Sequence, residues 1–293
     1  MDRYRKVLQE SNVPTDGDFI KKELEKISEK LDELRTPETY AKIFNCIDLT
    51  TLNTTDSQAS VTGFIQRVND FDNEYPQYPN VAAVCVYSNF AGLVRATLEV
   101  SDVKIAVVAG GFPSGQTFTA VKVADTALAV AEGADEVDVV MNLGMLRDGN
   151  YEELCDELIE VKHTAKDAHM KVIIESGALK EYSQIRDASI LAMYSEADFI
   201  KTSTGKVYEG ASPETAYVMC RCIKEYYEKT GRQVGFKAAG GVRSTEDALM
   251  YYAIVKDVLG EEWLNNTLFR IGASSLANNI LAEMLDEATV KYF

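Results

Sequence analysis

Histidine and cysteine are scarce in this chain of 293 residues, and their spacing argues against two classes of protein. The two histidines, His163 and His169, lie in one helical stretch, and none of the five cysteines forms a C-x-x-C pair. Zinc sites and disulfide scaffolds both depend on closely spaced, repeated Cys or His residues. The sequence therefore predicts no metal site and no disulfide framework, and it favours a reducing, cytoplasmic compartment.

Basic charge and long apolar runs are also lacking. Lys and Arg number 30 against 46 Asp and Glu, which gives a net charge of −16 and a pI of about 4.7. Such a surface repels nucleic acids and anionic membranes, although a local group of amides and lysines can still bind a small phosphate. No apolar run approaches the roughly 18–20 residues of a membrane span. The N-terminal segment MDRYRKVLQE lacks the apolar core of a signal peptide.

A regular alternation of apolar runs and helical stretches begins near residue 41. Helical patterns such as 117–133 and 151–169 separate the runs, which are short and rich in Val, Ile and Ala; they span residues 42–50, 81–87, 104–111, 136–142, 171–177, 197–204, 234–241 and 269–275. Eight strand–helix units in about 250 residues are typical of a (β/α)₈ TIM barrel. The alternative is an open doubly wound sheet, but no G-x-G-x-x-G motif follows the first run. We therefore expect residues 41–293 to form a barrel domain.

Residues 1–40 precede this alternation and are expected to form a helical extension. Apolar side chains spaced by four, three, four and three positions predict one amphipathic helix that ends before Pro37; they are Ile20, Leu24, Ile27, Leu31 and Leu34. The apolar stripe has two interpretations. It packs on the outside of the barrel, or it contacts a second subunit in a homo-oligomer.

Lysine interrupts two of the apolar runs. Lys201 follows Asp-Phe-Ile in the sixth run, and Lys237 follows Val-Gly-Phe in the seventh. The two lie about one βα unit apart, so we expect them on neighbouring strands at one depth of the barrel. Either lysine alone could be a strand-end residue whose ammonium reaches water. Two lysines on neighbouring strands at the same depth are much harder to explain as chance strand-end residues, and they indicate a shared function.

The chemistry available to such a pair is specific. A free lysine has a pKa near 10.4, so only about 0.04% of it is the neutral amine that attacks a carbonyl at pH 7. Burial and a second ammonium nearby both lower that pKa, and a value of about 7 raises the neutral fraction roughly a thousandfold. One lysine can then act as the nucleophile while the other stays cationic.

A carboxylate and three glycine-rich segments complete the candidate site. Asp138 lies within the fourth run, where it either balances a lysine charge or relays protons. Glycine and hydroxyl groups follow the sixth, seventh and eighth runs, which suits a phosphate held by backbone N–H groups at the carboxyl face of a barrel. The residues concerned are Gly205, Lys206, Gly240, Gly241, Gly272, Ser274 and Ser275.

Together these segments resemble the deoxyribose-phosphate aldolase family. The resemblance runs from about residue 42 to 276 and is carried by Asp48–Asn53, Glu136–Val140, Lys171–Glu175, Phe199–Lys206, Gly235–Arg243 and Gly272–Ser275. It implies a class I aldolase with neither metal nor organic cofactor. Such an enzyme reversibly cleaves 2-deoxy-D-ribose 5-phosphate to D-glyceraldehyde 3-phosphate and acetaldehyde.

The resemblance also assigns roles. It implies that Lys201 forms the Schiff base, that Lys237 perturbs it and that Asp138 transfers protons. Asp48 and Thr51 become candidates for binding the sugar hydroxyls. Another Schiff-base aldolase or transaldolase, and a catalytically silent binder of sugar phosphates, are the alternatives.

Three positions depart from the pattern or add to it. Ala238 follows the second lysine where many family members have proline. Tyr292 is penultimate, and a frayed tail is favoured over a tyrosine that folds back over the site. Cys85 ends the second run, where a small buried side chain is favoured over a reactive thiol.

Overall fold

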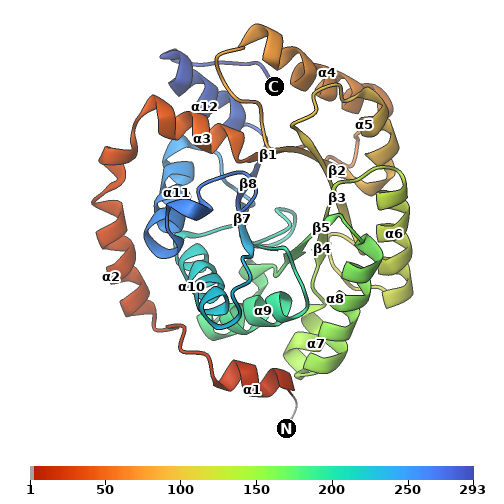
Figure 1. Ribbon diagram of the computed structural model, residues 1–293, viewed down its shortest axis with the longest axis vertical. Coiled ribbons are helices and arrows are strands. Elements are labelled where there is room, and N and C mark those ends of the chain that lie inside the picture. Colours follow the sequence, from red (N-terminus) through yellow and green to blue (C-terminus); the bar gives the residue numbers. More distant parts are fainter. Residues whose placement is uncertain (1–2) are drawn as a thin grey trace.

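The computed structural model describes residues 3–293 and contains a closed barrel of parallel strands (Figure 1). The strands pair in sequence order, and the last pairs with the first. They are β1 (Ile47–Thr50), β2 (Ala83–Tyr87), β3 (Lys104–Ala109), β4 (Glu136–Val140), β5 (His169–Ile173), β6 (Phe199–Lys201), β7 (Gly235–Ala239) and β8 (Phe269–Ala273). The predicted (β/α)₈ barrel is confirmed.

Helices surround the strands and cover their outward apolar side chains (Figure 1). The helices that follow successive strands are α4 (Gln58–Glu74), α5 (Ala91–Thr97), α6 (Thr119–Ala131), α8 (Tyr151–Ala165), α9 (Tyr182–Tyr194), α10 (Pro213–Thr230), α11 (Thr245–Leu259) and α12 (Leu276–Leu285). A short helix, α7 (Leu143–Asp148), lies between β4 and α8. Within residues 3–293 we find no helix that is both long and apolar enough to span a bilayer.

The first predicted strand, residues 42–50, is wrong in its first half. Residues 37–45 form helix α3 (Pro37–Asn45), and only the last four residues of the run pair with neighbouring strands. Thr36 caps this helix by accepting a hydrogen bond from the Thr39 N–H, and Pro37 suits its first turn. Ile43 and Phe44 are buried on the helix. A short apolar run does not distinguish a buried helix turn from a strand.

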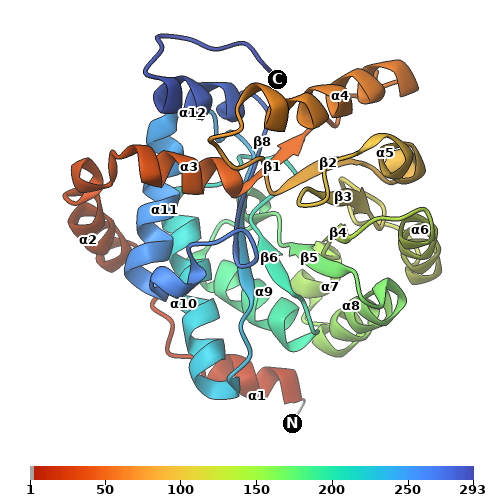
Figure 2. The ribbon, with the colours of Figure 1, turned by 45° about the horizontal axis from the view of Figure 1, so that its top comes forward.

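The N-terminal segment forms helices α1 (Arg3–Gln9) and α2 (Gly17–Ser28), followed by a 3₁₀ turn at Leu31–Leu34. The sequence predicted one helix that includes Leu31 and Leu34, whereas the α-helix ends at Ser28 and these two residues lie in the 3₁₀ turn. Figure 2 shows both helices on the outside of the barrel, where α1 contacts α8 and α9, and α2 contacts α10 and α11. Ile20, Leu24 and Ile27 are buried in the contact made by α2. This part of the apolar stripe is covered by the chain's own helices.

The barrel interior has an aromatic side chain near its amino end. Phe199 opens β6 and is buried, and it lies opposite Gly235 of β7 in the strand register. A Cβ atom on Gly235 would lie 2.2 Å from the Phe199 ring. Glycine at this position therefore makes room for the ring inside the barrel.

Candidate functional site

A cavity of about 260 Å³ opens at the carboxyl ends of β1, β6, β7 and β8. Barrel enzymes carry their active sites at this end. Its lining combines the loops that follow these strands with one charged side chain from within the barrel, Lys201. The lining residues are Thr50, Thr51, Leu52, Asn53, Lys201, Thr204, Gly205, Lys206, Ala239, Gly240, Gly241, Val242, Arg243, Gly272, Ala273 and Ser274.

The two lysines predicted at one depth are register partners on neighbouring strands. Lys201 of β6 pairs with Lys237 of β7. Each ammonium nitrogen lies 2.7 Å from the same oxygen, Oδ2 of Asp138. Lys201 is 3% exposed and reaches the cavity, whereas Lys237 is fully buried behind it. The structure thus brings together the three side chains that the sequence predicted as the reactive group.

Four further charged side chains extend this group toward the amino end of the barrel. Lys171 of β5 lies 3.0 Å from Oδ1 of Asp138 and 2.5 Å from Oε2 of Glu136. Arg270 of β8 donates to both oxygens of Glu136, at 3.0 and 2.7 Å, and to Oδ1 of Asp48 at 2.6 Å. The other oxygen of Asp48 accepts from Lys237. Every member is at most 3% exposed.

Sequence reasoning assigned no role to Lys171 or Arg270. The signal was the same one that identified the lysine pair, because both charges interrupt apolar strands at interior-facing positions. Lys171 is the register partner of Asp138, and Arg270 is the register partner of Lys237. Charged residues at alternate positions of several neighbouring strands predict an interior ionic network.

Burial and charge act on the lysines in opposite directions. Burial lowers the pKa of Lys201 below its usual range; the Asp138 carboxylate opposes this effect and the Lys237 ammonium adds to it. Burial also acts to lower the pKa of Lys237, but the carboxylates of Asp138 and Asp48 outweigh it and raise the value. The pKa of Lys171 is raised in the same way, since burial is outweighed by its carboxylate neighbours. Lys201 is therefore the amine of this group that loses its proton most readily.

Asp48, predicted as a contact for the sugar hydroxyls, lies in the barrel interior and outside the cavity lining. It is fully buried, it does not line the cavity, and its oxygens accept from Lys237 and Arg270. Its side chain points into the barrel because it lies one residue past the start of β1, and the carboxyl end of that strand is at Thr50. Thr51 does line the cavity, where its hydroxyl donates to Asp56 at 2.8 Å.

The predicted phosphate segments meet at one side of the cavity. Gly205, Gly240 and Gly241 have φ values of +71°, +84° and +80°, a region that residues with a Cβ rarely adopt. Ser274 lines the cavity, whereas Ser275 lies just beyond it at the N-terminus of α12. The first N–H groups of a helix lack intrahelical partners, so this end of α12 favours an anion. The ammonium of Lys206 donates to the Leu52 carbonyl oxygen.

Glu175 holds the segment after β6 in place. Its carboxylate accepts from the Thr204 N–H at 3.1 Å and from the Thr204 hydroxyl at 2.6 Å. Glu175 adopts a φ of +47°, and it is only 4% exposed. In the sequence Glu175 stands out only as part of a motif. A carboxylate close after the end of an apolar strand is the feature that could have identified it.

Tyr292 lies away from the reactive lysines, whereas Cys85 is buried close enough to act on them electrostatically. The Tyr292 ring packs edge-on against Phe71 and Tyr75 of the α4 region, and its backbone N–H donates to Asn278. The tail is therefore docked on α4 instead of frayed, and it does not cover the cavity. Cys85 is buried inside the barrel, and burial raises the pKa of its thiol.

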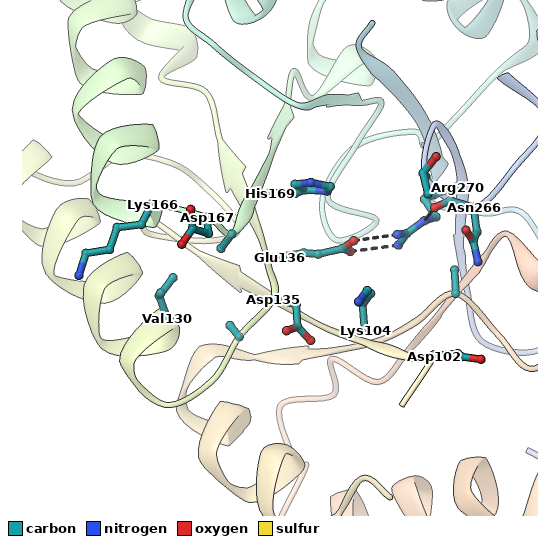
Figure 3. Close-up of a pocket in the computed structure, with 14 residues that line it drawn as sticks. Asp102, Lys104, Val130, Asp135, Glu136, Lys166, Asp167, His169, Asn266 and Arg270 are labelled. Atoms are coloured by element: carbon teal, nitrogen blue, oxygen red, sulfur yellow. Dashed lines mark hydrogen bonds and ion pairs between the residues drawn. The ribbon is translucent and has the colours of Figure 1, made fainter. Parts of the chain in front are cut away.

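The opposite end of the barrel carries a wider hollow of about 440 Å³ (Figure 3). It is lined by residues at or next to the starts of strands, including Lys104, Glu136 and His169. In Figure 3, Glu136 and Arg270 point toward one another across it and form two hydrogen bonds. Lys201 is absent from this lining. The smaller cavity at the carboxyl end is therefore the one that reaches the candidate nucleophile.

A cavity at the carboxyl end of a (β/α)₈ barrel, lined by a buried lysine, is the arrangement expected of a barrel enzyme. The sequence of the DeoC/LacD family aldolases matches residues 43–276, and the chain belongs to that family. It is accordingly an enzyme of the lyase class. The resemblance to deoxyribose-phosphate aldolases drawn from the motifs is confirmed.

Individual relatives agree with this assignment. The chain is 41% identical over 270 residues to a putative deoxyribose-phosphate aldolase of Caenorhabditis elegans, which covers 91% of this chain and 88% of the relative. It is 37% identical over 261 residues to the deoxyribose-phosphate aldolase of Homo sapiens, covering 86% and 82%. Both matches span most of each protein.

Solved structures share the fold. A putative deoxyribose-phosphate aldolase from Coccidioides immitis superposes with a TM-score of 0.68 at 27% identity, covering 80% of this chain and 83% of that one. The deoxyribose phosphate aldolase from Aeropyrum pernix, described as a tetramer, gives a TM-score of 0.66 at 25% identity, covering 87% and 95%.

Proposed function

We propose that this protein is a class I aldolase that reversibly cleaves 2-deoxy-D-ribose 5-phosphate to D-glyceraldehyde 3-phosphate and acetaldehyde. The observation that carries the proposal is the position of Lys201. It is a buried lysine at the floor of the carboxyl-end cavity, and its pKa is lowered by burial while a second lysine lies behind it. The names of the relatives support the choice of substrate.

The proposed reaction begins at the amine. Neutral Lys201 attacks the C1 aldehyde carbon of the open-chain sugar, and loss of water from the carbinolamine gives an iminium ion. Asp138 accepts a hydrogen bond from this amine and is positioned to exchange its protons. Lys237 hydrogen-bonds to the same carboxylate oxygen, and the ammonium groups of Lys171, Lys201 and Lys237 together outweigh burial and lower the pKa of Asp138, which keeps it ionised and able to accept a proton.

Bond cleavage follows from the iminium ion. Removal of the proton from the C3 hydroxyl lets the C2–C3 bond break, and its electron pair moves into an enamine attached to Lys201. D-Glyceraldehyde 3-phosphate leaves as the aldehyde. A proton then adds to C2, and water hydrolyses the resulting iminium ion to acetaldehyde and free Lys201. Asp138, together with water and Lys237, is proposed to move these protons.

The phosphate of the substrate is proposed to lie against the glycine-rich side of the cavity. Gly205, Gly240, Gly241 and Gly272 leave backbone N–H groups accessible, and Ser274 adds a hydroxyl. The Ser275 end of α12 adds the favourable potential of a helix N-terminus. Lys206 and Arg243 contribute positive charge at the same side. Thr51, across the cavity, is the remaining candidate contact for the sugar hydroxyls.

Chemical trapping tests the Schiff base directly. The protein is incubated with acetaldehyde, reduced with sodium borohydride and mapped by peptide mass spectrometry. We expect an ethyl group on Lys201, and no adduct at the cavity in a Lys201→Met variant. Cleavage of 2-deoxy-D-ribose 5-phosphate should fall on the order of 10⁴-fold or more in that variant. Near-normal turnover in Lys201→Met would rule out Lys201 as the Schiff-base lysine. A panel of sugar phosphates separates cleavage of 2-deoxy-D-ribose 5-phosphate from the reactions of other Schiff-base aldolases.

Self-association and compartment are proposed on separate grounds. The outward face of α6 and its preceding residue exposes Phe118, Val121 and Leu128, at 81%, 48% and 67%. An uncovered apolar face of this kind favours contact with a second copy of the chain. Light scattering on the purified protein gives the mass that tests self-association.

A cytoplasmic location is proposed from the cysteines. All five are free and buried, as is usual in a reducing compartment. Imaging of a tagged chain tests this location.

A further inference from the structure

The interior of the barrel contains an uneven set of charges. Its carboxylates are Asp48, Glu136 and Asp138, and its bases are Lys171, Lys201, Lys237 and Arg270. Three acids face four bases, so the group carries one positive charge in excess when every member is ionised. It is neutral when one base loses its proton. Because excess charge in a low-dielectric interior is costly, the neutral arrangement is favoured.

The contacts decide which base is neutral. Lys171 and Lys237 each contact two or more carboxylates, and Arg270 donates to both Glu136 and Asp48. Lys201 contacts one carboxylate, Asp138, and shares that oxygen with Lys237. Arg remains protonated under all ordinary conditions. Lys201 is therefore the base with the least compensation for its charge.

We propose that the Glu136–Arg270 ion pair, at the amino end of the barrel, is a positioning pair in which the charge of each member offsets that of the other and so sets the pH at which Lys201 becomes the neutral base. The proposal rests on the proposed function, because it assumes that the neutral amine of Lys201 is the reactive form. Neither side chain lines the cavity at the carboxyl end. The pair acts through Lys171, Asp48 and Asp138.

The connection between this pair and Lys201 is continuous. Oε2 of Glu136 is shared by Arg270 and Lys171, at 3.0 and 2.5 Å, and Lys171 contacts Asp138 at 3.0 Å. Asp138 in turn contacts Lys201 at 2.7 Å. A parallel connection runs from Arg270 through Asp48 and Lys237 to the same Asp138 oxygen. The Cys85 thiol, whose pKa is raised by burial, also acts on Lys201, and Lys206 and Arg243 line the same cavity.

Figure 3 shows why the pair occupies this place. Glu136 and Arg270 form the inner wall of the amino-end hollow, and their paired groups are the part of the ionic network that borders it. Arg270 is also fixed by donation to the Asn266 carbonyl oxygen, and its guanidinium lies 5.6 Å from the centre of the Phe199 ring. Arg270 is thus held by contacts beyond those it makes within the ionic network.

Charge-removing substitutions test the proposal because the two halves of the pair have opposite effects. Arg270→Met removes a positive charge, so Lys201 can keep its proton in a neutral interior and should react only at higher pH. Glu136→Gln removes a negative charge, so Lys201 should react at lower pH. The double variant restores the balance and should return close to the original pH dependence. Each single shift is expected to be on the order of one pH unit.

The measurement is the pH dependence of adduct formation at Lys201. Acetaldehyde and borohydride are applied in short pulses across a pH series, and the ethylated Lys201 peptide is quantified by mass spectrometry in each variant. Arg270→Lys keeps the charge and should retain the original midpoint. Lys162→Met is the matched control: it removes a cation paired with Asp198 at 2.7 Å, and neither residue belongs to the interior network. Its midpoint should not move.

The outcomes separate this inference from the proposed function. If the unmodified protein forms no adduct at Lys201, the proposed function fails. If it does form the adduct but the two single variants share the original midpoint, or shift in the same direction, the charge-balance proposal is overturned. Where one single variant is too unstable to assay, the other still decides, because the direction of its shift is fixed in advance: upward for Arg270→Met and downward for Glu136→Gln. Opposite shifts of the pH midpoint that cancel in the double variant support the charge-balance proposal. A general loss of packing would not move the midpoint up in one variant and down in the other.

Discussion

At the scale of single residues, the decisive relationship is that one carboxylate oxygen serves two lysines. Asp138 Oδ2 lies 2.7 Å from both Lys201 and Lys237. Asp138 therefore cannot compensate both charges fully, and the lysine with a second carboxylate retains its proton. That second carboxylate is Asp48, which accepts from Lys237. The division of roles between two chemically identical side chains follows from their partners.

Replacing the second lysine tests this division. In Lys237→Leu a buried positive charge is lost, and Lys201 no longer shares Oδ2 of Asp138 with a second ammonium. The pKa of Lys201 should rise, and its neutral fraction at pH 7 should fall tenfold for each unit of that rise. We expect turnover at pH 7 to drop by about 10²-fold or more. A pH–rate profile should recover part of the activity at alkaline pH.

Recovery at alkaline pH is the informative part of that experiment. A variant that is merely misfolded stays inactive at every pH, whereas a variant with a raised amine pKa gains activity as the pH increases. An unchanged acid limb in the profile of Lys237→Leu would contradict the role given to Lys237. Lys224→Leu on the outer helix α10 is a suitable control, because it removes a lysine that is not part of the interior network.

The sequence predicted the lysine pair and Asp138 because charged residues inside apolar runs are conspicuous. It could not predict the position of Asp48, since residue type does not reveal whether a carboxylate faces the cavity or the barrel interior. Strand alternation relates neighbours within one strand, but the depth of each strand depends on register between strands. Only the pairing of Asp48 with Ala83 and Gly272 fixes its level in the barrel.

At the scale of elements, the loops after β6 and β7 support one another. The backbones of Gly240 and Gly210 approach so closely that a Cβ on Gly240 would lie 2.9 Å from the Gly210 Cα and 2.6 Å from the Ser203 hydroxyl oxygen. The Ala211 N–H also donates to the Ala239 and Gly240 carbonyl oxygens. The proposed phosphate side of the cavity therefore depends on a glycine at position 240.

Gly240→Ala should weaken substrate binding more than it weakens the chemical step. The added methyl group meets both neighbouring atoms at a φ of +84°, so the loop must shift. We expect KM for the sugar phosphate to rise about tenfold, corresponding to roughly 1.4 kcal/mol. Steady-state kinetics measure it. Gly231→Ala has a similar φ of +73° but no atom within 4 Å, so it should cost stability without changing KM.

Helix α2 provides a second test at this scale. Ile20 is fully buried against the barrel helices, whereas its neighbour Phe19 is 40% exposed. Ile20→Ala should lower the free energy of unfolding by about 2–5 kcal/mol, and Phe19→Ala should lower it by much less. Urea denaturation of both variants gives the comparison. Equal, small effects would mean that α2 adds little to the stability of the barrel.

Most elements were predictable, and the errors share one cause. The eight runs gave each strand within a few residues, because buried parallel strands are continuous stretches of apolar residues. The first run was misassigned over residues 42–45, where helix α3 continues to Asn45. The N-terminal helix was predicted too long because Leu31 and Leu34 continue the apolar spacing through a 3₁₀ turn. Periodicity does not report where backbone hydrogen bonding changes.

At the scale of the whole molecule, an acidic exterior surrounds an interior that holds its own compensated charges. The chain carries a net charge of −16, yet the interior network has more bases than acids. The outer charges are hydrated and contribute little individually to stability. The inner charges are buried and depend on one another, so the pH dependence of folding should reflect them.

Acid should unfold the protein through its interior carboxylates. Burial acts to raise the pKa values of Asp48, Glu136 and Asp138, but neighbouring lysines and Arg270 outweigh it and lower all three. A carboxylate with a lowered folded pKa contributes stability above its unfolded pKa, near 4, and that contribution is lost as pH falls toward the folded value. Urea unfolding between pH 7 and pH 3 should show a steep loss below about pH 4.

The compensated double variant provides the comparison for this acid dependence. Glu136→Gln with Arg270→Met has one buried carboxylate fewer, so its free energy of unfolding should change less between pH 5 and pH 3 than that of the unmodified protein. An identical slope in both proteins would show that Glu136 does not take up a proton in this range on unfolding.

The Phe199 ring and the paired side chains of Glu136 and Arg270 occupy the amino end of the barrel, and this has a kinetic consequence for the proposed reaction. In the proposed reaction both reactants enter through the carboxyl-end cavity, which is lined by Lys201 of β6 and by the proposed phosphate-binding loops that follow the strands. In the synthetic direction acetaldehyde must therefore reach Lys201 before the phosphate-bearing aldehyde takes its place above. For the proposed reaction we therefore expect ordered binding, in which a high concentration of the second aldehyde inhibits the enzyme by blocking the first.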